Sequence, residues 1–276
     1  MPDPTFASPA VTVITVVRNG AATIGASVES VLAQSHRPVE HLILDGGSTD
    51  GTLEVLRRYG ERVRWISEPD RGLYDAMNKG LDLVRDPARY VIFLNADDSF
   101  HAPDALARVF ALSDREDFLY GRLERLDEDL GDRDVIGRSV TSRDLLFGMR
   151  CHHQTILARK SVFDRIGGFR IEYRIAADYD WVVRAFLSPG ITRRYVPVVV
   201  TTMRRGGFSE RSYLAGIGER RRIVRAAYSR ADLIRFLAYS VYGDYGRWGA
   251  QRLLRALGLL PLFRRLKRSI GAPAGA

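Results

Sequence analysis

The chain has 276 residues, of which 46% are hydrophobic and 27% are charged, and its formal net charge is +9. This composition is typical of a globular protein that is long enough for one large domain and a tail. The single cysteine, Cys151, excludes an intramolecular disulfide and favours a reducing compartment. Residues 1–10 lack the basic and apolar segments of a signal peptide, and no stretch reaches the ~18 to 20 apolar residues of a spanning helix. We therefore expect neither a secreted nor an integral membrane protein.

The positive charge is concentrated near the C-terminus. Residues 211–276 hold 14 of the 42 basic residues and only 3 of the 33 acidic ones, so the preceding residues hold 28 and 30. Basic residues of this tail alternate with leucine and aromatic residues, which suits an anionic membrane surface or nucleic acid. We predict a globular domain over 1–210, with halves at about 10–100 and 101–210, and a basic helical tail over 211–276.

Strand and helix patterns alternate through the first hundred residues. The apolar β-branched run over 11–17 predicts a buried strand, and apolar residues at helical spacing over 22–34 predict a helix. Further strands are expected over 41–45, 62–68 and 90–98, with helices from a Ser48 or Thr49 cap through Leu56 and over 72–84. This alternation predicts an α/β fold with a mostly parallel sheet that is covered on both faces.

After Phe100 the pattern is looser. Helices are expected over 103–112, 161–166 and 177–187, and β-strands over 117–140, 152–158 and 192–204. From Tyr213 onward the chain is expected to be helical, with breaks at Gly243, Gly246 and Pro261.

Polar residues follow the end of each strand in the first half. They are Arg18 and Asn19, then residues 45–50, 68–71 and 95–98. Ligands of parallel α/β sheets bind beyond the carboxyl ends of the strands. We therefore expect a binding site at this edge of the sheet.

The segment 95–98, Asn-Ala-Asp-Asp, follows an apolar strand. Adjacent carboxylates repel one another unless a cation or solvent compensates them, and Mg²⁺ or Mn²⁺ binds such carboxylates together with diphosphate oxygens. The segment thus predicts a metal site at Asp97 and Asp98, although a solvated turn before the next helix explains Asn95–Asp98 equally well.

Two further loops carry binding candidates. Asp45, followed by Gly-Gly-Ser-Thr-Asp-Gly-Thr, is placed to accept hydrogen bonds from a ribose hydroxyl or a base, or else forms a turn that caps a helix. In the segment 68–80, Arg71 is a candidate phosphate ligand, and Asp75 and Asn78 lie three residues apart on one helical face. No G-x-G-x-x-G fingerprint follows the first strand, which argues against a dinucleotide cofactor.

Asp178 and Asp180 lie two residues apart, so they do not share a helical face, and we expect one to face a site while the other caps or pairs. The site-facing carboxylate is a candidate general base, with an N-cap as the alternative. His152 and His153 point in opposite directions on a strand and lack further ligands at zinc spacing. For His153 and Gln154 we expect contacts to an acceptor or a diphosphate, or a structural role.

Taken in order, VTVITVVRNG, ILDGGSTDGT, EPDRGLYDAMNKG, FLNADD, GGF and ADYDWVVR resemble the family-2 glycosyltransferases, over roughly Val11 to Arg205. EPDRGLYDAMNKG with LNADD is most similar to the branch that builds bacterial exopolysaccharides such as colanic acid. The resemblance implies the GT-A fold and an inverting transfer from a nucleoside-diphosphate sugar to a glycan or lipid-linked acceptor, with Mg²⁺ or Mn²⁺ as cofactor.

The resemblance also assigns residues. Asp97, with Asp98, would bind the metal and Asp178 would be the catalytic base, while the nucleotide sugar would be held by Thr15, Asn19, Asp45, Arg71, Asp75, Asn78 and Asn95. Three positions depart from the family pattern. Gly46 replaces the second aspartate of D-D-G-S, Asn95 replaces the first aspartate of D-x-D, and Ala177 replaces a glutamate that often precedes the base.

The tail allows two interpretations. Leu253, Leu254, Leu257 and Leu260 can form an apolar stripe edged by arginines, which predicts an amphipathic segment on the membrane surface. The alternative is a helix that packs on the catalytic domain. We expect a cytoplasmic protein that is peripheral on the inner face of the plasma membrane. Two rival functions are a catalytically silent assembly partner and a nucleic-acid-binding protein, the latter without a recognisable module.

Overall fold

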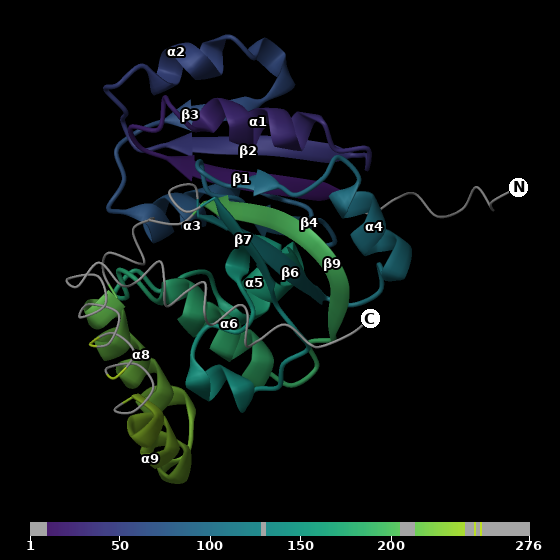
Figure 1. The fold of residues 1–276 in the computed structure, drawn as a ribbon. Helices are drawn as coiled ribbons and strands as arrows, with labels where there is room; N and C mark the ends of the chain where they lie inside the picture. Colours follow the sequence, from purple (N-terminus) through teal and green to yellow (C-terminus); the bar gives the residue numbers. More distant parts are fainter. Residues whose placement is uncertain (1–9, 128–130, 205–212, 241–245, 247–248, 250–276) are drawn as a thin grey trace, which may run out of the picture. The chain divides into compact units, whose positions relative to one another are not determined.

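The computed structural model describes residues 10–127, 131–204, 213–240, 246 and 249 (Figure 1). The chain divides into two compact units, Met1–Arg220 and Arg221–Ala276. The first unit holds the sheet and all the candidate site residues.

Four parallel strands form the first half of the sheet. They are β1 (Val11–Val17), β2 (Val39–Asp45), β3 (Arg64–Ser67) and β4 (Tyr90–Phe93), in the spatial order β3-β2-β1-β4. Val17 pairs with Asp45 and Asp45 pairs with Ser67, so these three strands end together. The predicted parallel sheet is confirmed, although β4 ends at Phe93 and residues 95–98 lie in the loop beyond it.

The second half of the sheet is mixed. It contains β6 (Phe118–Asp127), β7 (Asp132–Ile136), β8 (Ile156–Arg159), β9 (Arg193–Arg204) and the short β5 (Ser99–Phe100). The order continues β4-β8-β6-β9-β5, β7 pairs with β6, and β6 runs parallel to β9. The predicted strand over 152–158 is only partly correct, because His153–Thr155 forms a 3-10 turn, η3, before β8.

Helices cover both faces of the parallel strands (Figure 1). Helices α1 (Ile24–Leu32) and α2 (Thr52–Arg57) pack on the face that carries Val17 and Ile43. Helix α3 (Leu73–Leu83) packs on the opposite face, where a Cβ at Gly80 would lie 2.7 Å from Cγ2 of Ile14. The predicted cap of α2 is wrong, because its N-cap is Gly51 and no side chain caps it.

Three helices follow in the second half of the first unit. They are α4 (Ala105–Leu112), α5 (Lys160–Ile166) and α6 (Ala177–Leu187), all at the positions that the sequence pattern predicts. Short 3-10 turns, η1 (Gly60–Arg62) and η2 (Asp144–Phe147), lie in the connections. The second residue of α6 is Asp178.

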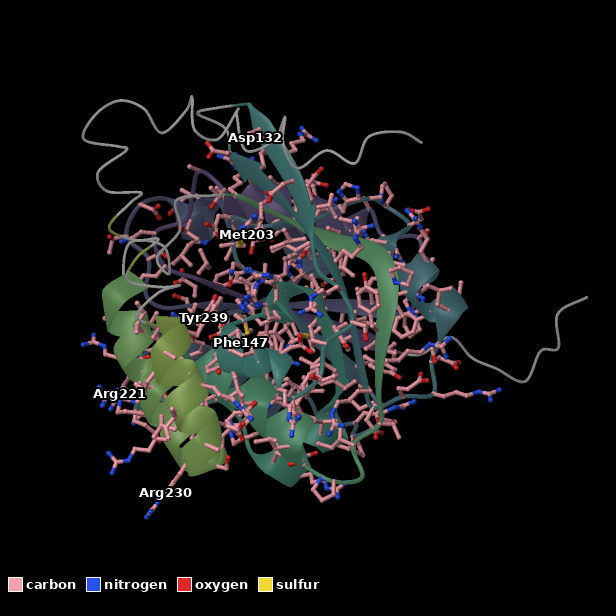
Figure 2. All side chains as sticks on the ribbon, turned by 60° about the horizontal axis from the view of Figure 1, so that its bottom comes forward. Asp132, Phe147, Met203, Arg221, Arg230 and Tyr239 are labelled. Atoms are coloured by element: carbon pink, nitrogen blue, oxygen red, sulfur yellow. The ribbon has the colours of Figure 1, made fainter. Side chains whose placement is uncertain are left out.

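The predicted helical tail is confirmed where it is described, by α8 (Tyr213–Ala227) and α9 (Arg230–Tyr239). Arg221 and Arg230 are exposed and extend outward from their helices (Figure 2). Among the described residues, none of the helices is both long and apolar enough to cross a bilayer. The leucine stripe predicted at 253–260, and the breaks at Gly243 and Pro261, lie outside the described residues.

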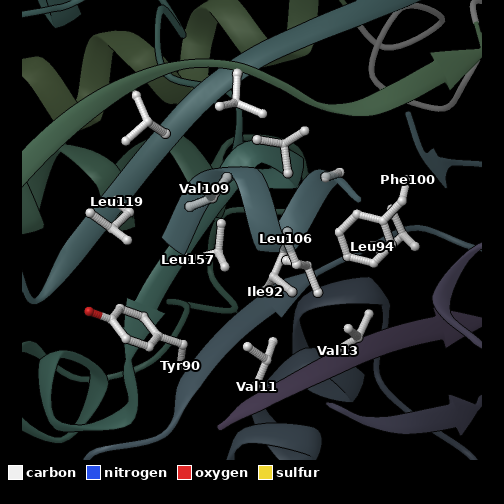
Figure 3. Close-up of a cluster of buried hydrophobic side chains, with 14 of the residues drawn as sticks. Val11, Val13, Tyr90, Ile92, Leu94, Phe100, Leu106, Val109, Leu119 and Leu157 are labelled. Atoms are coloured by element: carbon white, nitrogen blue, oxygen red, sulfur yellow. The ribbon is translucent and has the colours of Figure 1, made fainter. Parts of the chain in front are cut away.

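A buried core connects the two halves of the sheet (Figure 3). Val11, Val13 and Ile92 of the parallel strands pack with Leu106 and Val109 of α4. All five side chains are completely buried, and burial of each is worth about 1.5–3 kcal/mol. This core fixes the position of β4, and therefore of the acidic loop that follows it.

Candidate active site

Asp45 stands at the carboxyl end of β2, where its carboxylate organises the surrounding loop. One oxygen, Oδ2, accepts hydrogen bonds from the backbone N–H of Gly47 and Ser48 and from Oγ of Ser67, at 3.1, 3.0 and 2.7 Å. The hydroxyl of Ser48 donates to the other oxygen. Asp45 is 2% exposed. Its hydrogen bonds fix the conformation of the loop and leave the loop backbone as the surface that a ligand would contact.

Asn19 joins the loop after β1 to the loop after β2. Its backbone N–H donates to Oγ of Ser48 at 2.7 Å, and its Oδ1 accepts from the N–H of Thr49 at 2.9 Å. The φ of Asn19 is 55°, a left-handed conformation that asparagine tolerates better than most residues. Asn19 is exposed, so it lies at the surface of the predicted site and keeps its two loops together.

Arg71 and Asp75 form an ion pair at the start of α3. The guanidinium of Arg71 lies 2.6 Å from Oδ1 of Asp75, and the backbone N–H of Arg71 donates to Oδ2 at 3.0 Å. The hydrogen bond from Arg71 lowers the pKa of Asp75. Because the Arg71 side chain is 73% exposed while that of Asp75 is 10% exposed, Asp75 orients the arginine and the remaining guanidinium donors face solvent.

Two predicted donor ligands have other partners in the fold. Thr15 is completely buried under α1, and its hydroxyl lies 2.9 Å from Nε2 of His41. The amide of Asn78 binds the backbone of Phe169 twice, with Nδ2 donating to the carbonyl and Oδ1 accepting from the N–H, both at 2.8 Å. Strand alternation turns Thr15 inward and the 167–169 turn binds Asn78, so these contacts give both side chains a structural role.

Gly46 is the first departure from the family pattern, and the side chain of Asp70 from the next loop occupies the space beside it. A Cβ at Gly46 would lie only 2.2 Å from Oδ2 of Asp70. Oδ1 of Asp70 accepts from the N–H of Gly72 at 2.7 Å, which fixes this carboxylate in place. A carboxylate therefore stands beside position 46 although residue 46 does not supply it.

The acidic segment after β4 contains one exposed and one buried carboxylate. Asp97 is exposed and accepts no hydrogen bond from the described residues. Asp98 is 2% exposed, and its Oδ2 accepts from Nδ2 of Asn95 at 3.0 Å and from Nε2 of Gln154 at 3.3 Å. Burial, reinforced by the charge of Asp97, raises the pKa of Asp98 to about 7.

Asp178 is held by three donors from three parts of the chain. The hydroxyl of Tyr74 and Nδ1 of His153 each lie 3.0 Å from its carboxylate, and the N–H of Tyr179 donates at 2.8 Å. Burial alone would raise the pKa of Asp178, but these hydrogen bonds and the charge of His153 outweigh it and lower the pKa. The second aspartate of this segment, Asp180, pairs with Arg184 at 2.8 Å, as expected for one of the two.

The turn η3 joins these two carboxylate groups. His153 binds Asp178, and the next residue, Gln154, binds Asp98. Nε2 of Gln154 also lies 3.4 Å from the sulfur of Met203, which Figure 2 labels on β9. Asp98 and Asp178 are thus brought to one site, and His153 and Gln154 hold them there. These contacts are those of a structural role for His153 and Gln154, which is the alternative to a direct contact with an acceptor or a diphosphate.

Oxygen atoms of the acidic segment suit a hard divalent cation. Oδ1 of Asn95 and Oδ1 of Asp98 are buried and lack a partner among the described residues, and the Asp97 carboxylate lies beside them in the sequence. The described parts of the chain contain no cluster of three or more His, Cys, Asp or Glu side chains arranged as a complete metal site. The free oxygens of Asn95 and Asp98 nevertheless fit an ion such as Mg²⁺, because this ion takes only one or two protein carboxylates and completes its shell with phosphate and water oxygens.

The profile of glycosyl transferase family 2 matches residues 12–177. The chain belongs to this family. A PGL/p-HBAD biosynthesis glycosyltransferase of Mycobacterium bovis is 36% identical over 220 residues, which cover 74% of this chain and 80% of the relative. The protein is therefore a glycosyltransferase, as the ordered motifs predict. The predicted likeness to the exopolysaccharide branch stays a prediction.

Solved structures identify the fold of the glycosyltransferase as GT-A. It is similar to S. aureus TarS 1-349 in complex with UDP-GlcNAc, with a TM-score of 0.64 and 18% identity over 83% of this chain and 70% of that one. The mannosyltransferase PcManGT from Pyrobaculum calidifontis, in complex with GDP-Man and Mn²⁺, gives 0.54 and 22% over 96% and 90%. The glycosyltransferase spans 42% of a longer TarS chain.

Sequence reasoning missed three residues of this site. Tyr74 lies in the segment EPDRGLYDAMNKG, but nothing in the spacing indicates that α3 carries its hydroxyl to Asp178. Asp70 stands among other charged residues in the segment 68–80, and nothing in the sequence indicates its place beside Gly46. Glu219 accepts hydrogen bonds from the backbone just ahead of α6, yet it lies in the basic tail, where no local pattern separates it from a surface charge.

Proposed function

We propose that this glycosyltransferase moves a sugar from a nucleoside-diphosphate donor to a hydroxyl group of a glycan acceptor, with inversion and with Asp178 as the general base. The observation that carries the proposal is the link through η3, in which His153 and Gln154 bring Asp178 and the acidic segment together. Solved relatives of the same fold hold UDP-GlcNAc and GDP-Man, which supports this class of donor.

The first half of the sheet would hold the nucleotide. Asp45 and Asn19 shape two neighbouring loops whose backbone N–H groups and glycines admit a close ligand. The guanidinium of Arg71, exposed and oriented by Asp75, supplies donors for the diphosphate. Asp70 offers a carboxylate beside Gly46, the position at which the family has its second aspartate.

The base step uses the carboxylate of Asp178. Its lowered pKa keeps it ionised at neutral pH. Among the described residues, Oδ2 accepts only from His153, so a lone pair remains for the proton of the acceptor hydroxyl. As that proton moves to Oδ2, the hydroxyl oxygen forms the new bond to the anomeric carbon. The bond from this carbon to the diphosphate oxygen breaks, and the nucleoside diphosphate leaves with the electron pair.

Asp97, Asp98 and Asn95 are the residues that would hold Mg²⁺ or Mn²⁺. When bound, such an ion neutralises negative charge that develops on the departing diphosphate. Gln154 and Asn95 keep the buried Asp98 in place through their amide donors. The Mn²⁺ in the mannosyltransferase complex supports the assignment of this class of cofactor.

For the acceptor we propose a lipid-linked glycan of a cell-surface polysaccharide or exopolysaccharide, met at the inner face of the plasma membrane. The exposed arginines of α8 and α9 and the basic residues beyond them support attraction to anionic lipid. Pelleting of the whole chain with phosphatidylglycerol vesicles, but not with phosphatidylcholine vesicles, is the expected result. Equal recovery with both would contradict the membrane part.

A donor screen tests the enzymatic part. Thermal shift against UDP-, GDP- and dTDP-sugars with Mn²⁺ should select one nucleotide, and release of the nucleoside diphosphate should require the metal and stop with EDTA. Turnover that persists in EDTA would remove the cofactor assignment. Donor binding without turnover on any acceptor would indicate a silent assembly partner, and salt-sensitive DNA binding without donor binding would favour the nucleic-acid alternative.

A further inference from the structure

Glu219, on α8, is a buried acid in the most basic region of the sequence. Its carboxylate accepts hydrogen bonds from the backbone N–H groups of three successive residues, Arg174, Ile175 and Ala176, each at 2.9 Å. The side chain is only 8% exposed. Three amides that converge on one carboxylate form a strong, oriented anion site.

The three amides lie directly before the helix that carries the proposed base. Helix α6 begins at Ala177, its N-cap is Ala176, and no side chain of the segment caps it. The first N–H groups of a helix need acceptors and favour a negative charge. Glu219 supplies both from a helix more than forty residues further along the chain.

The same backbone segment also holds a second partner of the base. The hydroxyl of Tyr74 lies 2.8 Å from the carbonyl oxygen of Ile175 and 3.0 Å from Oδ1 of Asp178. Helix α8 approaches this segment closely at a glycine, because a Cβ at Gly216 would lie 3.3 Å from Cγ2 of Ile175. Ile175 is thus fixed through its N–H by Glu219, and its carbonyl oxygen shares the single hydroxyl proton of Tyr74 with Asp178.

We propose that Glu219 is a positioning residue for Asp178. It fixes the backbone from which α6 starts and thereby directs the Asp178 carboxylate toward the acceptor hydroxyl. This role rests on the proposed function of Asp178 as the base. It makes the first turns of α8 part of the catalytic apparatus, although Glu219 lies beyond the residues that match the family profile.

Two substitutions of Glu219 should lower kcat to different extents. Glu219→Gln keeps one acceptor oxygen and loses the charge, and Glu219→Ala leaves the three amides without their acceptor. Since a displacement of about 1 Å at a reacting group can cost on the order of 100-fold in rate, we expect kcat to fall about tenfold in the first variant and about 100-fold in the second. The donor KM should stay unchanged in both, because the donor loops lie at other strand ends. Glu172→Gln is the matched control, since Glu172 is exposed in the loop ahead of α6.

The experiment uses the full chain and follows nucleoside-diphosphate release from the sugar nucleotide that the screen selects, with kcat counted per donor-binding site. Hydrogen exchange of the peptide that contains residues 174–176 is measured alongside. Faster exchange of this peptide with a loss in kcat at constant KM is the expected result. Because general unfolding lowers the number of binding sites and not the rate per site, the kcat and KM split separates positioning from stability.

Each outcome has a distinct meaning. If the Glu219 variants match the wild type and the Glu172→Gln control in kcat, the positioning role is wrong while the proposed function stands. A loss confined to KM also overturns it. A wild-type chain that releases no nucleoside diphosphate from any sugar nucleotide in the screen contradicts the proposed function itself.

Discussion

The two halves of the sheet build their parts of the site in different ways. In the first half, Asp45, Asn19 and Arg71 follow the ends of parallel strands, and the regular register of those strands brings them to one edge. In the second half, Asp178 meets Tyr74 of α3 and His153 of η3, which lie 104 and 25 residues away in sequence. The first arrangement follows from the architecture, whereas the second depends on side-chain contacts between unrelated elements.

This difference predicts different sensitivities. Polar groups of the first half largely bind one another, so single changes there should alter donor affinity or loop stability. Asp178 is held by hydrogen bonds from His153 of η3 and from Tyr74, so the loss of one of these donors should change the pKa and the orientation of its carboxylate. Substitutions in the second half should therefore act on the rate of transfer.

The largest effect is expected for Asp178→Asn. The amide has nearly the same shape but cannot take a proton, so kcat should fall about 1,000-fold, within the range for loss of a general base. Donor binding, measured by calorimetry with the selected nucleotide and Mn²⁺, should be retained. If the variant turns over at the wild-type rate, Asp178 is not the base.

The second effect concerns Asp97→Ala in the acidic segment. We expect donor affinity in Mn²⁺ to fall by roughly 100-fold, as for loss of a metal ligand or its close support. Affinity measured in EDTA should be the same for the variant and the wild type. A variant that responds to Mn²⁺ as the wild type does would show that the ion binds elsewhere.

The third effect is a change in pH dependence. Hydrogen bonding from His153 is the main influence that lowers the pKa of Asp178 against burial, so His153→Ala should raise that pKa. The carboxylate must be ionised to act, and the acid limb of kcat/KM should therefore move to higher pH. At its optimum the rate should fall about tenfold for the lost hydrogen bond to a charged group.

His153→Asn tests the same contact, because its Nδ2 can replace Nδ1 as the donor, and it should restore part of the wild-type profile. The contribution of Asp178 to the free energy of unfolding also depends on pH. Because the folded-state pKa of Asp178 is lowered, its contribution is present above the unfolded-state pKa and is lost as the pH falls through the folded-state value. An acid limb that stays in place in the alanine variant would contradict the assigned role of His153.

The smallest effect is expected for Gly46→Ala in the first half. The new Cβ would meet Asp70 Oδ2 at 2.2 Å, and the strain should cost about 1–3 kcal/mol of unfolding free energy. Adding Asp70→Ala should recover most of this loss but weaken donor binding. Gly218→Ala is the comparison without a clash, because no atom lies within 4 Å of its added Cβ, and it should raise stability by about 0.5–1 kcal/mol through helix propensity. Additive effects at positions 46 and 70 would show that the two do not interact.

Much of the fold could be predicted because its signals are local. Apolar runs over 11–17 and 41–45 and helical spacing over 22–34 depend on burial periodicity, which neighbouring residues alone define. The turn at His153–Thr155 could not be predicted, because its polar residues lead directly into the apolar start of β8 without a glycine or proline to mark a turn. The roles of Asp97, Asp98 and Asp178 stay predictions, since the sequence identifies them only as carboxylates able to do this chemistry. The contacts of Asn78 and Thr15 depend on which face each side chain takes.

By itself, the sequence determined the parallel α/β core, the order of its motifs, membership of the glycosyltransferase family and the edge of the sheet at which polar residues gather. These properties follow from periodicity and from strand direction. Only the tertiary structure decided that Asp70 stands beside Gly46, that η3 joins Asp98 to Asp178, and that Glu219 holds the start of α6. Each of these contacts joins residues that are distant in sequence, and their hydrogen bonds form only after packing has brought the elements together.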